Sequence, residues 1–176
     1  MNDVIVRTGT PADMATLMEM AKLGAQENGM VPFDINQIAK EFWPALHLDF
    51  GIVGIVGPSD GTIEGAVLLR ITTFWYGFKE GPQAKPMIEE RWLWTHQDYR
   101  AAKGGRARKL CEFVKTTSDQ LGLPLMIGIL SNIRLESKIK LYERVFGKPC
   151  GVTWMYRPPQ IAERAAPSDQ ILQASI

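Results

Sequence analysis

The chain has 176 residues, 45% of them apolar, which is enough for the core of one domain. Its formal net charge is +1, whereas a general nucleic-acid binder is usually more basic. Its few cysteines and histidines show neither zinc-ligand spacing nor a disulfide framework. The first residues lack the apolar core of a signal peptide, and no apolar run reaches the roughly 18 residues of a membrane span. We therefore expect a soluble cytoplasmic protein without a metal site.

The first elements are a strand and two helices. VIVR (4–7) predicts a short strand, and TPAD predicts a helix start with Thr10 as its N-cap. This first helix should end at Gly29. The segment DINQIAKEFWPAL predicts a second helix, capped by Asp34 and ended or bent at Pro44.

Three strands are predicted next. They cover residues 50–57, 62–76 and 87–96. The turn PSDG joins the first two strands as a hairpin, because proline, aspartate and glycine favour tight turns. A loop rich in glycine, proline and lysine, GFKEGPQAKP, leads into the third strand.

The second half of the chain alternates helices and strands. A helix runs to about Leu121, and its predicted inward stripe is Ala107, Leu110, Cys111, Val114 and Leu121. LMIGIL (125–130) predicts a strand of the kind buried on both faces. A further helix is capped by Ser131 or Asn132, and Leu135, Ile139, Tyr142 and Phe146 share one of its faces. A final strand, GVTWMYR, precedes a tail rich in proline, alanine and glutamine.

The predicted element order fixes the fold class. A meander followed by β-α-β-α-β implies a mixed sheet of the α/β or α+β class. We expect a single domain over residues 1–157 and a C-terminal tail over residues 158–176.

A basic, glycine-containing loop opens the third predicted helix. Its cations are Arg100, Lys103, Arg106, Arg108 and Lys109, and they surround Gly104 and Gly105. Glycines and a helix N-terminus let backbone amides approach an anion closely, so the loop predicts binding of a phosphate-bearing ligand. The chain has no Walker loop and no early G-x-G-x-x-G. The alternative is a solvated basic helix start.

This loop and the element order resemble the GNAT N-acyltransferases over roughly Val4 to Arg157. The resemblance implies a mixed, mostly antiparallel central sheet flanked by about four helices. It also implies that acetyl-CoA is the co-substrate and a primary amine the acetyl acceptor. Members carry [QR]-x-x-G-x-[GA] before the third helix, where its amides bind the CoA pyrophosphate.

Two registers of this motif fit the loop. If the motif begins at Arg100, then Lys103 and Gly105 occupy its glycine and its glycine-or-alanine position. In the register that we favour, Gly105 and Ala107 take those positions, because an apolar stripe begins at Ala107. The CoA-binding residues that the resemblance implies are Leu93, Trp94, Thr95, Arg100, Lys103, Gly104, Gly105, Arg106, Ala107 and Asn132. A backbone N–H of the stretch 93–95 would stabilise the thioester oxygen.

The segment LYERVFG resembles the family's N-x-x-A-x-x-L-Y-x-x-x-G-F helix. Leu141, Tyr142 and Gly147 match, whereas Asn132 lies ten positions before the tyrosine instead of seven. The resemblance implies that Tyr142 protonates the departing CoA thiolate, a role that suits a phenol. The alternative is a tyrosine that only packs in the core.

Attack on a thioester requires a neutral amine, so a base must take the amine's proton. By its place on the fourth strand, Glu89 fits the family's base, with Glu90 as the alternative on the opposite face. The base could also act through water, and both carboxylates could instead be solvated or ion-paired. No segment identifies the acceptor, which could be a polyamine, an amino acid, an aminoglycoside or a protein amine.

Two other functional classes stay open. A GNAT-fold protein without catalysis could bind CoA as a sensor or act as an interaction module, and the irregular glycine motif favours this alternative. A small nucleic-acid-binding protein using the basic loop is the third hypothesis, against which the near-neutral net charge counts. Pairing of strand edges, common in the family, would allow a homodimer.

Overall fold

The structure is a computed structural model that describes residues 3–28, 34–59, 61–73, 86–100, 105–129, 131 and 133–151. Apart from Gly151, the predicted strand GVTWMYR lies outside these residues, as does the tail. Most of the loop GFKEGPQAKP, with Lys103, Gly104 and Asn132, lies outside them as well.

The N-terminal elements begin where the sequence predicts. They are β1 (Val4–Thr8), the short 3-10 helix η1 (Pro11–Asp13), α1 (Met14–Asn28) and α2 (Ile35–Leu46). The backbone N–H of Thr10 donates to Asp13 Oδ2 over 2.8 Å, which closes the helix start. The Asp34 carboxylate accepts the Asn36 N–H and confirms the second cap. Pro44 lies in the last turn of α2, which ends two residues later.

Five strands form one sheet in the order β1-β2-β3-β4-β5. The other strands are β2 (Gly51–Pro58), β3 (Gly65–Thr73), β4 (Pro86–Thr95) and β5 (Leu125–Met126). Neighbouring strands are antiparallel except β4 and β5, which are parallel. The remaining helices are η2 (Gln97–Tyr99), α3 (Arg106–Leu121) and α4 (Leu135–Phe146). The predicted mixed, mostly antiparallel class is confirmed.

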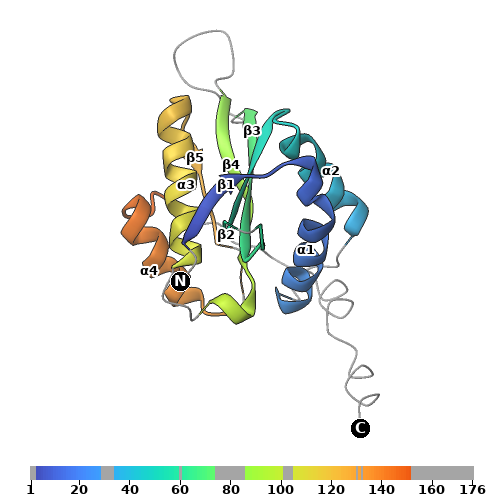
Figure 1. The fold of residues 1–176 in the computed structure, drawn as a ribbon. Helices are drawn as coiled ribbons and strands as arrows, with labels where there is room; N and C mark the ends of the chain where they lie inside the picture. Colours follow the sequence, from blue (N-terminus) through green and yellow to red (C-terminus); the bar gives the residue numbers. More distant parts are fainter. Residues whose placement is uncertain are drawn as a thin grey trace, which may run out of the picture.

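The sheet separates two helical layers (Figure 1). Helices α1 and α2 cover one face, and α3 and α4 lie on the other. Leu17, Phe42 and Leu68 are central to the first core, and Val67, Leu110 and Val114 to the second. Both cores are apolar, so the sheet is held from both sides.

The prediction of a strand buried on both faces over 125–130 is wrong. β5 has two residues, which pair with Ile88 and Glu89 of β4, and Met126 is 43% exposed. The chain from Ile127 to Ile129 instead lines an open cleft beside β4. Its apolar composition therefore reflects the wall of a cleft and not a central strand.

Two predictions about helix ends are also wrong. Ser131 does not cap α4, because its hydroxyl bonds the backbone of Ile133, and the N-cap is Arg134 in a left-handed conformation. Leu121 is 45% exposed and does not face the core, since the helix ends beside it at Gly122.

Candidate active site

One large cleft, of about 1000 Å³, opens between β4 and the segment that follows β5. We call it the β4–β5 cleft. Its walls are the second half of β4, the start of α3, residues 126–129 and the cleft-facing side of α4. The described residues among the sequence-predicted site all line it: Glu89, Glu90, Leu93, Trp94, Thr95, Arg100, Gly105, Arg106, Ala107 and Tyr142.

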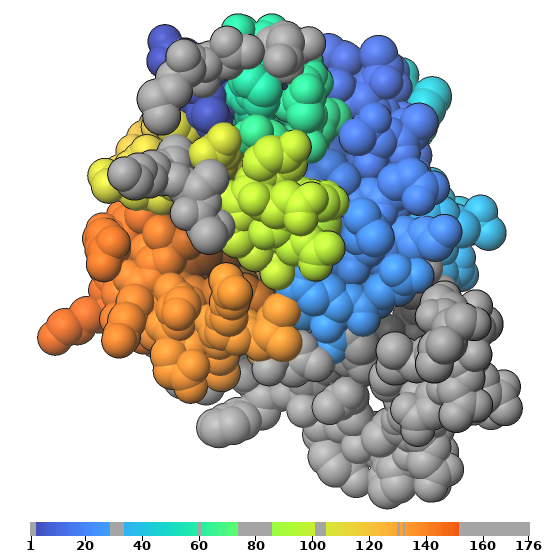
Figure 2. Space-filling model, turned by 60° about the horizontal axis from the view of Figure 1, so that its bottom comes forward, coloured from blue at the N-terminus to red at the C-terminus, as the bar shows by residue number. Residues whose placement is uncertain are grey.

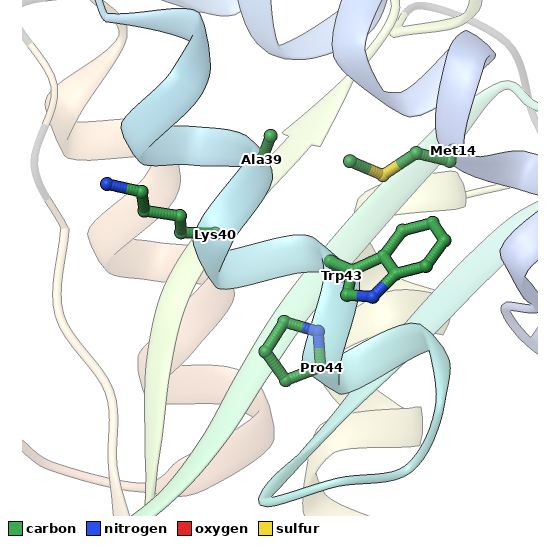
Figure 3. A pocket seen from close by; sticks show the side chains of 5 residues that line it. All are labelled: Met14, Ala39, Lys40, Trp43 and Pro44. Carbon is green, nitrogen blue, oxygen red and sulfur yellow. The ribbon is translucent and has the colours of Figure 1, made fainter.

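A second hollow of about 370 Å³ lies on the outer side of α1 and α2 (Figure 3). It is lined by Met14, Ala39, Lys40, Trp43 and Pro44. Figure 3 shows the Trp43 ring between Met14 and Pro44, with the Lys40 amine directed away from them. Among the described residues that line it, Lys40 alone is titratable, so the β4–β5 cleft is the better candidate for chemistry.

The cleft exists because β4 loses its partner. Only Ile88 and Glu89 pair with β5 within the described residues, so the following edge of β4 borders the cleft. The register with β3 also shifts there: Leu69 faces Glu90 and Leu68 faces Trp92, which leaves Arg91 as a bulge. Bulges are frequent beside active sites, where they redirect side chains.

The two candidate carboxylates lie in different surroundings. Glu89 receives a 3.1 Å ion pair from Arg91, which also lies 3.7 Å from Glu41 of α2. Glu90 is directed to the other face, where the Tyr142 hydroxyl donates to its Oε2 over 3.5 Å. Both glutamates line the cleft, but Glu89 is held in an ion-pair network by Arg91, whereas Glu90 contacts Tyr142.

Burial controls the protonation of Glu90. It raises the pKa of this carboxyl to about 7, although hydrogen bonds from the Gly128 backbone and from Tyr142 favour the charged form. Burial, followed by the charge of Glu90, raises the pKa of Tyr142 far above its ordinary value. Near neutral pH the phenol keeps its proton, while the carboxyl exchanges one readily.

Cys111 lies close to this pair but is a core residue. It is fully buried in α3, and burial raises the pKa of its thiol to about 12. A thiol that stays protonated is a poor nucleophile. The sequence-based interpretation of Cys111 as a small apolar residue is confirmed.

The start of α3 forms the opposite end of the cleft. Gly105 is its N-cap, with a left-handed φ of 59°, and no side chain among the described residues caps the helix. The amides of the first turn are therefore available to an anion. Leu110 is fully buried and belongs to the predicted inward stripe of the helix.

Two arginines of the basic loop are already paired. Arg106 Nε lies 2.6 Å from Glu64 Oε2, and both side chains are largely buried. Arg100 donates to both carboxylate oxygens of Glu27 at the end of α1, and its Nε donates to the Thr95 carbonyl over 2.9 Å. These guanidinium groups hold the cleft walls together, so less free positive charge faces the cleft than the sequence suggests.

Sequence reasoning missed several lining residues. Glu27 is one, because only the folded chain brings it to Arg100 and to the Trp94 indole. Burial acts to raise the pKa of Glu27, but these hydrogen bonds outweigh it and the net shift is downward. Arg134 and Lys138 also line the cleft. They lie eight and four residues before Tyr142, a helical spacing that could have revealed them.

Figure 2 shows the face of the molecule on which elements that line the cleft adjoin. The end of β4 with η2 (yellow-green), α4 and the residues before it (orange) and the C-terminal end of α1 (blue) meet there.

Within the described ranges, no three His, Cys, Asp or Glu side chains gather as a metal site. Nor does any described helix have the length and apolar character to cross a membrane.

No protein-family model and no curated protein matches the sequence. Solved structures do match. The aminoglycoside N-acetyltransferase AAC(6')-Iy in complex with CoA has a TM-score of 0.65 at 14% identity, covering 90% of this chain and 97% of that one. A predicted acetyltransferase with acetyl-CoA from Clostridium acetobutylicum has a TM-score of 0.65 at 12% identity, with 88% and 96% covered.

A ribosomal-protein-alanine N-acetyltransferase from Brucella melitensis has a TM-score of 0.61 at 15% identity, covering 88% of this chain and 98% of that one. The chain has the GNAT acetyltransferase fold. At such low identity the likeness concerns the fold, and the departures from the GNAT glycine motif agree with a divergent sequence. Roles of individual residues must therefore come from the geometry of the β4–β5 cleft.

Proposed function

We propose that the protein transfers an acetyl group from acetyl-CoA to a primary amine by direct attack in a ternary complex. One observation carries this proposal: Tyr142 and Glu90, a proton donor and a proton acceptor, lie 3.5 Å apart in the β4–β5 cleft. The cleft ends at the uncapped N-terminus of α3. A long ligand with phosphates at one end and a reactive acyl group at the other suits this arrangement.

Acetyl-CoA fits the cleft in size and charge. A volume of about 1000 Å³ is at the upper end of the range of ligand pockets. The first-turn amides of α3 would hold the pyrophosphate, with Gly105 permitting a close approach. Arg106 and Arg100 pair with Glu64 and Glu27, which balance their charges. These arginines would therefore support the pyrophosphate end by holding the cleft walls in place. Lys103, Gly104 and Asn132 stay predicted contacts outside the described residues.

Glu90 is the better candidate for the base. Its pKa of about 7 provides both an ionised fraction near neutral pH and enough basicity to accept a proton from an ammonium. Glu89 is held by Arg91 in the ion-pair network. We therefore assign proton removal to Glu90, directly or through one water.

Tyr142 would donate a proton to the departing thiolate. Its raised pKa keeps the phenol protonated until a stronger base forms beside it. The cleft-facing edge of β4 at Leu93 to Thr95, which pairs with no strand among the described residues, would supply a backbone N–H to the oxyanion. Glu90 then acts as the base, the β4 backbone N–H as the oxyanion donor and Tyr142 as the acid.

A CoA-binding protein without catalysis is the second candidate. The observation that favours it is the pairing of Arg100 and Arg106, which leaves fewer free cations for the phosphates. The acceptor also stays open. Two structural neighbours are named for aminoglycosides and for ribosomal-protein alanine, and an amine is what the two acceptors share.

Calorimetry with acetyl-CoA tests the proposal, with desulfo-CoA and ADP as comparators at moderate salt. We expect saturable binding that requires the pantetheine arm, since the cleft continues from α3 to Tyr142. A panel of amines then reports transfer by release of free thiol. If acetyl-CoA does not bind at about millimolar concentration, where a binding free energy of only about −4 kcal/mol would be detected, the proposal is wrong.

A further inference from the structure

We propose that Lys138 is itself an acetyl acceptor, so that the protein acetylates its own helix α4 from acetyl-CoA bound in the β4–β5 cleft. The inference rests on the proposed function, because it needs acetyl-CoA in that cleft. It adds a modification site on a side chain that the transfer reaction does not use.

The position of Lys138 on α4 suits an acetyl acceptor. It precedes Tyr142 by four residues, so the two side chains lie on the same face of α4, about 6 Å apart at their Cβ atoms. Both line the cleft, together with Arg134 and Leu141. If Tyr142 donates its proton to the CoA sulfur, the thioester carbonyl lies within reach of a lysine one helical turn away. A flexible four-carbon stem can cover that distance.

The amine of Lys138 is held at the cleft wall. Its Nζ donates to the Ser131 hydroxyl, which lies 3.4 Å from Asn28 Oδ1 at the end of α1. Lys138 forms no ion pair within the described residues. Glu27, whose charge acts on Lys138, already binds Arg100 through both of its carboxylate oxygens. A lysine tied only to a hydroxyl can leave its position more readily than one held by a carboxylate.

The surroundings favour the neutral amine. Burial lowers the pKa of Lys138, and the nearby charges of Arg100 and Arg134 lower it further. Glu27 acts in the opposite direction, but the net shift is downward. Lys138 therefore carries a reactive lone pair in a larger fraction of molecules than an exposed lysine does.

The reaction balances without another reactant. The Lys138 nitrogen bonds to the thioester carbon, the carbon–sulfur bond breaks, and the electron pair leaves with the CoA sulfur. The nitrogen loses one proton to Glu90 or water, and the sulfur gains one from Tyr142. The products are an acetylated lysine and free CoA. The modification removes one positive charge from the cleft and extends the side chain into it, so it should weaken acceptor binding.

Lys140 provides a matched control. It lies on the same helix, is exposed and does not line the cleft. Residues two positions apart in an α-helix are rotated by about 200° around the helix axis, so Lys140 lies on the opposite side from Lys138. Any lysine reacts slowly with acetyl-CoA in solution, and Lys140 measures that background. The variants are Lys138→Arg, which keeps the charge, and Lys140→Arg.

The experiment is peptide mapping by mass spectrometry after incubation with acetyl-CoA. We expect Lys138 to be acetylated severalfold faster than Lys140, at a rate per molecule that does not depend on protein concentration. Lys138→Arg should lose only this site, and Lys140→Arg should retain it. Tyr142→Phe should slow labelling of Lys138 by about 100-fold, as expected when a general acid is lost, and leave Lys140 labelling unchanged.

Three results would overturn the inference, and they are distinguishable. If acetyl-CoA binds and the amine panel shows transfer, but Lys138 is labelled no faster than Lys140, the self-acetylation is wrong and the proposed function stands. If acetyl-CoA does not bind, both are wrong. Labelling of Lys138 that is as fast in unfolded protein as in folded protein also contradicts the inference, because the cleft would then contribute nothing.

Discussion

The Tyr142 hydroxyl and the Glu90 carboxylate share one hydrogen bond across the β4–β5 cleft, from α4 to β4. The bond stabilises the ionised carboxylate, while burial, and after it the carboxylate charge, keeps the phenol protonated. The two groups are therefore coupled, and changing one must alter the titration of the other.

Tyr142→Phe should lower kcat by about 100-fold, because the thiolate loses its proton donor. The affinity for acetyl-CoA should change little, since the phenol would act only as the carbon–sulfur bond breaks. The pKa of Glu90 should rise, because its charged form loses a hydrogen bond. Steady-state kinetics across pH and calorimetry measure these effects. An unchanged kcat would show that Tyr142 is only a packing residue.

Glu90→Gln should remove the pH dependence that a base with a pKa of about 7 imposes. In the parent protein the rate should rise with pH through about 7, because only the ionised carboxylate accepts a proton. The variant should lose this rising limb of the pH–rate profile and most of its activity. Glu89→Gln is the matched control on the opposite face and should keep the limb, since Glu89 is paired with Arg91. The reverse result would make Glu89 the base.

The sequence predicted most elements because local signals specify them. Thr10 and Asp34 begin their helices as expected, and Gly122 ends α3 in a left-handed conformation. β5 was misjudged because an apolar run looks alike in a buried strand and in a cleft wall. The start of α4 was misjudged because Ser131 uses its hydroxyl locally and not as a cap.

The glycine loop led to residues that line the β4–β5 cleft, but the contacts between the cleft residues could not be predicted. Arg100 and Glu27 are 73 residues apart, so their pairing depends on the packing of α1 against the end of β4. The choice between Glu89 and Glu90 depends on which face each side chain occupies. Alternation assigns the two glutamates to opposite faces, but it does not reveal that Arg91 pairs with Glu89 and that Tyr142 contacts Glu90.

Gly105→Ala should weaken acetyl-CoA binding and lower stability together. A side chain at a φ of 59° costs about 1–2 kcal/mol, and relief of that strain would move the start of α3. Gly122→Ala is the control, because it has a φ of 63° at the other end of the same helix, away from the cleft. It should lose similar stability without any loss of affinity. Equal affinity in both variants would contradict pyrophosphate binding at Gly105.

Arg100→Gln should destabilise the fold by about 1–3 kcal/mol, because Glu27 would stay partly buried without its charged partner. The double variant with Glu27→Gln should recover part of this loss, since no unpaired charge remains. Urea denaturation of the four proteins gives the coupling energy. Additive effects would mean that the pair contributes nothing. A loss of acetyl-CoA affinity without a loss of stability would instead favour direct phosphate binding by Arg100.

Asp13→Asn should reduce stability in a pH-dependent way. The hydrogen bonds from Arg7 lower the pKa of Asp13 from 3.8 to about 2, so the ionised carboxylate stabilises the folded state. This contribution is complete above the unfolded pKa and is lost as the pH falls through about 2. With allowance for the partly exposed Arg7, we expect a loss of about 1–2 kcal/mol at neutral pH.

The difference between Asp13→Asn and the parent should therefore shrink as the pH falls from about 4 to about 2, because the parent's own carboxyl becomes protonated there. Asp119→Asn serves as the control, since Asp119 is exposed and pairs with Lys115 one turn earlier on α3. It should change stability by no more than about 0.5 kcal/mol. Urea denaturation at several pH values measures both effects. A penalty for Asp13→Asn that is independent of pH would place its origin in packing and not in the ion pair with Arg7.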